Sequence, residues 1–174
     1  MAARTKSRGK ASPSKAKGHR IPDLGFRSLA FGAGESIPVR YTADGQNISP
    51  PLSWDEPPEG TRVLALVCED SDAPMPEPFV HWLVANLNPE QSGRELVEGA
   101  TVLSGAVLGK NSFGFIEYGG PEPPRGHGIH HYYFTLFALD APVELAAGFS
   151  KEDLLRAAKG HVLAKGECIG TYRR

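Results

Sequence analysis

Apolar residues form several short, continuous runs along the chain, and each run has the length of a strand. The first covers 63–68, the second 80–87, and the third, rich in aromatic residues, 129–139. A run that is apolar at consecutive positions is typical of a strand whose two faces are both covered. A final strand is predicted over 167–172 and a shorter one over 39–42.

One helix is predicted near the end of the chain. Ser150 is a good N-cap, and Asp153, at the third helical position, can return the capping hydrogen bond. Apolar residues then recur at helical spacing, at Leu154, Leu155, Ala158 and Val162. Because strands do not alternate with helices, the pattern favours a mainly β fold, a β-sandwich with a few short helices, over a doubly wound α/β fold.

Composition and charge add two constraints. With 174 residues, 40% of them hydrophobic, the chain is large enough for one domain with a sizeable core. Its 20 glycines and 15 prolines are many for a helical protein and normal for a loop-rich β protein. Residues 1–20 carry seven of the 19 basic residues and no acidic one, which leaves 12 basic against 20 acidic residues, a net charge of −8, on the remainder.

The basic segment marks a domain boundary. Residues 1–22 are predicted to form a basic disordered tail, and 23–174 a single domain, because no aromatic or apolar anchor is interleaved with the basic residues. Contact of the tail with nucleic acid or an anionic surface is disfavoured for the same reason. The tail lacks the apolar run of a secretory signal, and no stretch is long enough to span a membrane, so a cytoplasmic protein is expected.

Several common chemistries lack their motifs. Cys68 and Cys168 lie in strand-like runs, without a C-x-x-C pair or a metal-ligand pattern, so buried free thiols are predicted while a disulfide between them stays open. No G-x-S-x-G elbow precedes a helix, and neither a P-loop nor a dinucleotide fingerprint is present. Nucleophilic catalysis and nucleotide binding are therefore disfavoured.

Polar residues gather first around two aspartates. The segment Glu69–Pro74 follows the first apolar run, and His81 lies at the start of the second. Asp70 and Asp72 fit acid–base chemistry or cation binding, because paired carboxylates serve both. Taken alone, the two residues are better explained by turn chemistry, in which Asp side chains bond to the local backbone. His81, taken alone, is more often a structural histidine than a ligand contact.

The second polar segment is the more informative one. A loop rich in glycine and proline leads His127, His130 and Tyr132 to the start of the third apolar run. His130 and His131 point to opposite faces of a strand, which disfavours a zinc site that uses both. His130 and Tyr132 share a face and can donate to one anion, which the backbone N–H groups of the glycines can also approach. We therefore expect an anion pocket, with no metal and no cofactor.

Three segments together are similar to the phosphatidylethanolamine-binding protein family, also called the Raf kinase inhibitor protein family, in its bacterial and archaeal branch. They are Ser49–Trp54, Asp70–Pro74 with His81–Val84, and Tyr118–Pro121 with Gly128–His130 and Tyr132. The resemblance covers roughly residues 24–174.

This resemblance implies a Greek-key antiparallel β-sandwich with a small anion pocket at one end. In the family the pocket binds phosphate-like groups, including phospholipid headgroups, and no catalytic activity is generally accepted. By motif, the pocket residues fall here on Asp70, His81, Gly120, Pro124, His130 and Tyr132. The resemblance also implies cis peptide bonds at Ala73–Pro74 and at Glu77–Pro78.

The chain departs from the family pattern near this pocket. Ser71 replaces the usual proline of the first motif, His131 replaces the usual arginine of the second, and Glu122 adds a negative charge. If the family arginine pairs with the second acid, Asp72 has lost a permanent partner here, and a histidine replaces it only when protonated. Glu122 is expected to weaken anion binding.

The expected function is that of a non-catalytic binding protein for a small anionic or phosphorylated ligand. An inhibitor of a serine protease or a kinase, with a protein partner, is the first alternative, and a hydrolase that uses His130 and Asp70 is the second. A homodimer is left open. Because His81 and His130 gain a proton as the pH falls, the affinity for phosphate-type ligands should rise as the pH falls.

Overall fold

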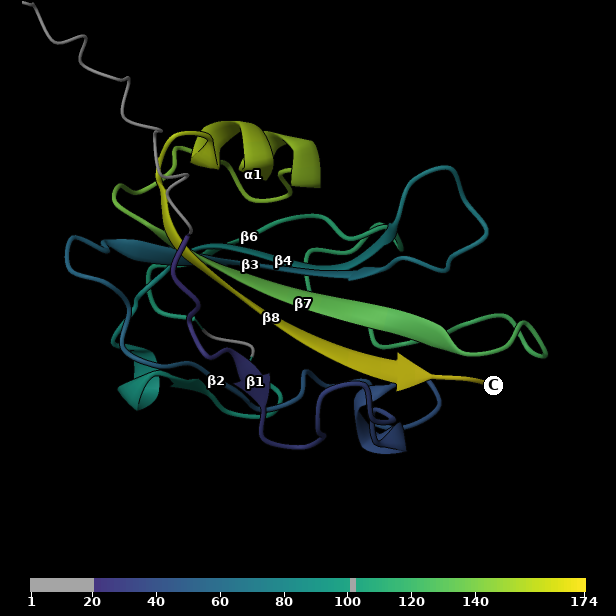
Figure 1. The fold of residues 1–174 in the computed structure, drawn as a ribbon. Coiled ribbons are helices and arrows are strands. Elements are labelled where there is room, and N and C mark those ends of the chain that lie inside the picture. Colours follow the sequence, from purple (N-terminus) through teal and green to yellow (C-terminus); the bar gives the residue numbers. More distant parts are fainter. Residues whose placement is uncertain (1–20, 101–102) are drawn as a thin grey trace, which may run out of the picture.

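The computed structural model describes residues 21–100 and 103–174, which form two antiparallel β-sheets, one α-helix and two 3₁₀ helices (Figure 1). The elements in chain order are β1 (Arg27–Ser28), η1 (Val39–Tyr41), β2 (Leu52–Ser53), β3 (Val63–Asp70), β4 (Phe79–Leu87), η2 (Gln91–Gly93), β5 (Glu95–Leu96), β6 (Val107–Leu108), β7 (His130–Leu139), α1 (Lys151–Ala158) and β8 (Val162–Tyr172). The larger sheet has the order β6-β4-β3-β7-β8 and the smaller one the order β1-β2-β5.

The larger sheet is covered on both faces. Figure 1 shows α1 on one face and the small sheet on the other. Along β3 the side chains alternate between the two cores: Leu64 and Leu66 belong to the core under the small sheet, whereas Ala65 and Val67 belong to the core under α1. This alternation explains why β3 is apolar at consecutive positions.

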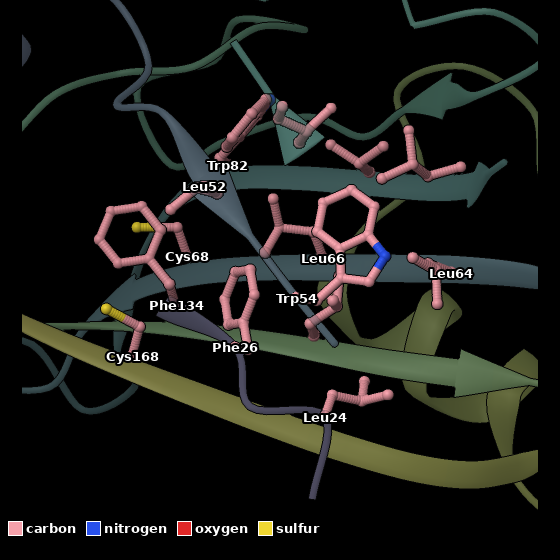
Figure 2. Packing of buried hydrophobic residues seen from close by; sticks show 14 of the residues in the cluster. Leu24, Phe26, Leu52, Trp54, Leu64, Leu66, Cys68, Trp82, Phe134 and Cys168 are labelled. Carbon is pink, nitrogen blue, oxygen red and sulfur yellow. The ribbon is translucent and has the colours of Figure 1, made fainter. Parts of the chain in front are cut away.

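The core between the sheets contains most of the large side chains. Trp54 and Phe26, from the side of the small sheet, pack against Leu66 and Phe134 of the larger sheet (Figure 2). All four of these residues are buried. The predicted fold class, an antiparallel β-sandwich with a few short helices, is confirmed.

Helix α1 begins as its sequence predicts. The Ser150 hydroxyl accepts from the Asp153 N–H at 3.2 Å, and the Asp153 carboxylate accepts from the Ser150 N–H at 3.1 Å. Leu154 and Ala158 pack on the outer face of the sheet. The predicted continuation of the helix to Val162 is wrong, because Gly160 adopts a left-handed conformation with φ of 88° and Val162 begins β8.

The short strand predicted over 39–42 is also wrong. Val39–Tyr41 is a 3₁₀ helix, in which the Tyr41 N–H donates to the Pro38 carbonyl at 2.9 Å. The Thr42 hydroxyl closes the turn by donating to the Val39 carbonyl at 2.9 Å. A hydroxyl that bonds locally to the backbone competes with strand pairing, which overrides the β preference of these residues.

The two cysteines are free and buried, as predicted. Cys68 of β3 and Cys168 of β8 both lie opposite Phe134 of the intervening strand β7. Two strand spacings separate them by about 10 Å, which is too far for a disulfide. Burial raises the pKa of both thiols, most strongly that of Cys68, so both stay protonated at neutral pH.

The basic segment 1–20 lies outside the described residues. Near the start of the described residues, the Pro22 carbonyl accepts from the Lys165 N–H of β8 at 3.0 Å. Within 21–100 and 103–174, no helix is long and apolar enough to cross a membrane.

Candidate functional site

Three strand ends meet at one end of the larger sheet. Because the strands are antiparallel, β3 ends where β4 and β7 begin, and Asp70 lies opposite both Phe79 and Tyr132. This juxtaposition brings together Asp70, His81 and His130, which come from segments that are far apart in the sequence. The loop before β7 crosses the same end.

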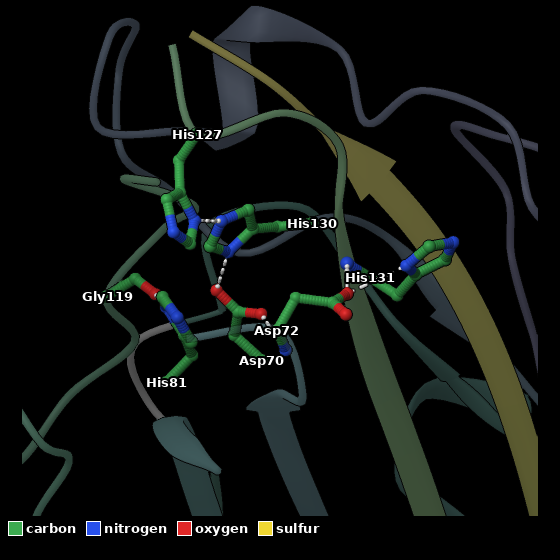
Figure 3. Close-up of polar contacts among 7 residues, drawn as sticks. All are labelled: Asp70, Asp72, His81, Gly119, His127, His130 and His131. Carbon is green, nitrogen blue, oxygen red and sulfur yellow. Dashed lines mark hydrogen bonds and ion pairs between the residues drawn. The ribbon is translucent and has the colours of Figure 1, made fainter. Parts of the chain in front are cut away.

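Asp70 and His130 form a buried pair at the centre of this end (Figure 3). The His130 Nδ1 lies 2.7 Å from Asp70 Oδ2, and since a carboxylate only accepts, Nδ1 carries the proton. The other oxygen of Asp70 accepts from the Asp72 N–H at 2.8 Å. Asp70 therefore closes the local turn, as the turn-chemistry explanation expects, and it also orients His130.

A third residue extends the pair. His127 Nδ1 lies 2.8 Å from His130 Nε2, so both ring nitrogens of His130 have partners (Figure 3). His130 is buried, whereas His127 is exposed in the loop before β7. The result is a hydrogen-bonded chain from a buried carboxylate to the protein surface.

His81 is a buried, neutral histidine. Burial lowers its pKa, and its Nδ1–H donates to the Gly119 carbonyl at 2.6 Å. In this neutral form Nε2 has no proton and is an acceptor. The rings of Phe79, Phe113 and Tyr132 surround the imidazole, with centroids 5.2, 5.4 and 5.1 Å away.

Asp70, His81 and His130 line a cavity of about 200 Å³. Its walls are mostly apolar, and no lysine, arginine, serine, threonine or cysteine belongs to its lining within the described parts of the chain. Among the described residues, the Asp70–His130 pair thus has no hydroxyl, thiol or amine side chain beside it in the cavity. The lining residues are Asp70, Ala73, Pro74, Met75, Phe79, His81, Phe113, Glu122, Pro123, Pro124 and His130.

Four of the six residues predicted from the sequence line this cavity: Asp70, His81, Pro124 and His130. Gly120 and Tyr132 lie outside its lining. The Gly120 N–H donates to the Asn47 side chain at 2.7 Å and is not free for an anion. The lack of a side chain at Gly120 is nevertheless required, since a Cβ there would lie 2.6 Å from the Tyr41 carbonyl oxygen.

Tyr132 supports the cavity from beneath. It shares a face with His130, as predicted, but it is fully buried and packs edge-on against His81. Its hydroxyl has no hydrogen-bond partner among the described residues. Burial, followed by the negative charge of Asp70, raises the pKa of Tyr132, so the phenol stays protonated.

Asp72 and His131 form a separate, exposed pair. Asp72 Oδ2 accepts from the His131 backbone N–H at 2.8 Å and lies 2.7 Å from His131 Nδ1. Partial burial acts to raise the pKa of Asp72, but the hydrogen bonds from the ring and backbone of His131 outweigh it and lower that pKa. His131 thus contacts Asp72 in place of the family's usual arginine, and it need not be protonated to do so, because a neutral histidine also donates through Nδ1–H.

Glu122, the added acid at the cavity, has a cationic neighbour. Arg174 Nη1 lies 3.4 Å from Glu122 Oε1, and Arg174 Nη2 lies 2.7 Å from Asp44 Oδ1. This pairing offsets part of the negative charge that Glu122 brings to the cavity wall.

The loop between β3 and β4 corrects one further prediction. No peptide bond in the described residues is cis, so the predicted cis bonds at Ala73–Pro74 and Glu77–Pro78 are wrong. The loop instead turns through a bond from the Met75 N–H to the Ala73 carbonyl at 2.7 Å. No group of three or more histidine, cysteine or acidic residues suited to a metal ion occurs in the described ranges.

Sequence reasoning missed the apolar walls. Phe79, Phe113 and Met75 line the cavity; Met75 and Phe79 lie close to the polar motifs in sequence, whereas Phe113 does not. Phe113 reaches the site from a loop after β6 and packs edge-on against Phe79 with 4.7 Å between ring centroids. No periodicity or motif marks that loop, so this contact follows from tertiary packing alone.

Comparison with protein families gives one result that covers most of the chain. The family model described as phosphatidylethanolamine-binding protein matches residues 27–173. A UPF0098 protein of Methanothermobacter thermautotrophicus is 44% identical over 153 residues, which make up 87% of this chain and 99% of the relative. A UPF0098 protein of Aquifex aeolicus is 44% identical over 151 residues, or 84% of this chain and 86% of the relative.

Two solved structures are similar over nearly their full length. A Chlamydia trachomatis protein described as a phosphatidylethanolamine-binding protein homolog has a TM-score of 0.80 and 40% identity, covering 87% of this chain and 98% of that protein. Escherichia coli YbcL, described as a member of the mammalian PEBP family, has a TM-score of 0.79 and 28% identity, covering 87% and 99%.

Proposed function

The chain belongs to the phosphatidylethanolamine-binding protein family, and on that premise we propose that it is a non-catalytic binding protein for a phosphate-type group. The observation that supports this most directly is the convergence of His130, held by Asp70, and His81 on one cavity. Its apolar walls favour a phosphate that carries an apolar or aromatic substituent, from a phospholipid headgroup or another phosphorylated ligand.

The charges in the cavity select the protonation state of the ligand. Asp70 and Glu122 repel a fully ionised phosphate, and no lysine or arginine of the described residues lines the cavity to offset them. A monoanionic phosphate can instead donate its own proton to a carboxylate or to the neutral His81. Phosphate monoesters take up that proton near pH 6. Binding should therefore strengthen as the pH falls toward 6.

The experiment is a calorimetric titration of the protein with phenyl phosphate and with methyl phosphate, repeated with His130→Ala. Phenyl phosphate should bind more tightly than methyl phosphate, because its ring lies against the apolar walls. His130→Ala should abolish most of the binding. His161→Ala is the matched control, since His161 also pairs with an aspartate but lies at the far end of β7. Equal binding by all three proteins would exclude this cavity as the phosphate site.

A protein inhibitor of a serine protease or kinase is the second candidate. The observation that favours it is a pair of exposed apolar side chains at the cavity: Met75 belongs to its lining, and Phe115 lines an adjoining depression that shares Phe113 and Glu122 with it. Exposed apolar groups that gather around a cavity mark interaction surfaces. Inhibition of a protease or kinase that is retained in His130→Ala and lost in a Met75→Ser, Phe115→Ser double variant would support this alternative.

A further inference from the structure

The second ring nitrogen of His130 is already occupied. Nδ1 donates to Asp70, and Nε2 lies 2.8 Å from Nδ1 of His127. An imidazole has two hydrogen-bonding nitrogens, so none is left on His130 for an external anion. The exposed His127 therefore occupies the atom of His130 that a phosphate would use.

We propose that His127 is an internal occupant of the anion site, which a ligand must displace from His130 before it binds. The inference rests on the proposed function of the cavity and adds a means of regulation to it. His127 competes with the ligand for His130, and it controls access without contributing a contact to the bound state.

The surroundings of His127 allow this displacement. Gly126 and Gly128, on either side, have φ of 75° and 100°, and a Cβ built at either one would have no atom within 4 Å. The turn is held by its backbone: the Gly126 N–H donates to the Arg174 carbonyl and the His127 N–H to the Pro124 carbonyl, each at 3.1 Å. The imidazole can thus rotate into solvent while the backbone stays in place, which is a rapid and inexpensive motion for an exposed side chain.

Protons decide how firmly His127 is held. When His130 is neutral, its bare Nε2 accepts from the His127 Nδ1–H, and when His130 alone is protonated, its Nε2–H donates to a bare Nδ1. When both rings are protonated, two N–H groups face each other and the contact is lost. Acid thus releases His127 and leaves on His130 the N–H donor that an anion requires.

The neighbouring charges act on His130 from several elements. Asp70 is in contact with it, and the buried His81 lines the same cavity. Asp72 is engaged by His131. The charged and titratable groups around the two rings are Asp70 and Asp72 at the end of β3, His81 on β4, Glu122 and Arg125 in the loop, His131 and Tyr132 on β7, and Arg174 after β8.

The test is calorimetric titration with phenyl phosphate at pH 8 and pH 5.5, using the wild type, His127→Ala, His130→Ala and the control His161→Ala. One hydrogen bond between neutral groups changes an equilibrium by roughly two- to tenfold. His127→Ala should therefore bind two- to tenfold more tightly than the wild type at pH 8, and this advantage should shrink at pH 5.5. Weaker or equal binding by His127→Ala at pH 8 would overturn the inference.

The other variants separate this inference from the proposed function. If His130→Ala binds like the wild type, the cavity is not the phosphate site and both proposals are wrong. If His130→Ala loses binding while His127→Ala matches the wild type, only the role of His127 is excluded. Nitrogen NMR of the histidine rings in the wild type gives an independent readout: saturation with phenyl phosphate should shift the His127 ring to the position of an exposed histidine, and an unchanged His127 signal would contradict displacement.

Discussion

The two ends of β7 each carry a histidine–aspartate pair. At the start, His130 Nδ1 lies 2.7 Å from Asp70, with side chains 1% and 5% exposed. Just past the end, Asp140 lies 2.7 Å from His161 Nδ1, with side chains 44% and 46% exposed. The distance between nitrogen and carboxylate oxygen is the same in the two pairs, and only their burial differs, so this distance alone does not identify a functional site.

Two loops bury the Asp70–His130 pair, whereas the Asp140–His161 pair stays exposed. The loops between β3 and β4 and before β7 enclose Asp70 and His130 and leave a cavity beside them. Electrostatic interactions and hydrogen bonds strengthen in such a low-dielectric environment, and an unpaired polar group there is costly. The Asp140–His161 pair is open to water, which screens it and competes for both partners.

The largest expected effect is the stability lost when each aspartate is removed. Asp70→Ala leaves a buried imidazole N–H without an acceptor and should lower the free energy of unfolding by about 1–3 kcal/mol. Asp140→Ala removes an exposed partner and should cost less than about 1 kcal/mol. Urea denaturation followed by circular dichroism measures both values.

Asp70→Asn sharpens this comparison, because the amide oxygen can still accept from His130 while the charge is gone. We expect its stability to lie between those of the wild type and Asp70→Ala. Equal losses for Asp70→Ala and Asp140→Ala would mean that the burial of the first pair has no energetic consequence.

The second prediction concerns pH and the buried His81. Burial lowers the pKa of His81 below its ordinary value of 6.5, so the unfolded chain binds a proton there that the folded protein does not. Stability should therefore fall as the pH decreases through about 6.5, by at most about 1.4 kcal/mol per pH unit from this residue. Denaturation curves between pH 8 and pH 5 for the wild type and His81→Phe measure the slope.

The difference between the two slopes isolates His81. His81→Phe removes the titrating ring but keeps an aromatic group against Phe79 and Phe113, so its stability should depend less on pH. Identical slopes would show that His81 does not titrate differently in the folded and unfolded states.

Strands were predictable where burial leaves a strong pattern. The consecutive apolar residues of β3 face two different cores, and the sequence alone indicated a strand covered on both faces. The cap of α1 was predictable for a different reason: it involves only Ser150 and Asp153, which are close together in the sequence. The strand predicted over 39–42 was wrong, because Pro38 and the Thr42 hydroxyl favour a 3₁₀ turn over a short strand.

The site was predictable only in its polar part. Asp70, His81 and His130 lie in recognisable motifs, and the antiparallel order of β3, β4 and β7 brings them together. Phe113 comes from a loop without periodicity, so its place in the wall depends on tertiary packing. The contact between His127 and His130 was equally inaccessible, because it depends on the conformation of a turn between two glycines.

The third prediction concerns the exposed Asp72–His131 pair beside the site, where the family usually has an arginine in place of His131. His131→Arg places a permanent positive charge next to Asp72, whose side chain is 42% exposed. Because water screens this position, the free energy of unfolding should change by less than about 1 kcal/mol, and less still at high salt. Urea denaturation at low and high ionic strength measures this change. An increase of several kcal/mol would mean that the pair behaves like the buried one.

The smallest effect is expected from removing residues 1–20. This segment carries seven basic residues and no acidic one. The residues that follow it run beside Lys165, which lies opposite Phe137, near the end of β7 that carries the Asp140–His161 pair. A segment without apolar anchors adds little to folding, so its deletion should leave the melting temperature nearly unchanged. The alternative is attraction between these basic residues and the acidic domain, which salt would weaken. A large drop in melting temperature on deletion, reproduced in the full chain by high salt, would contradict the prediction.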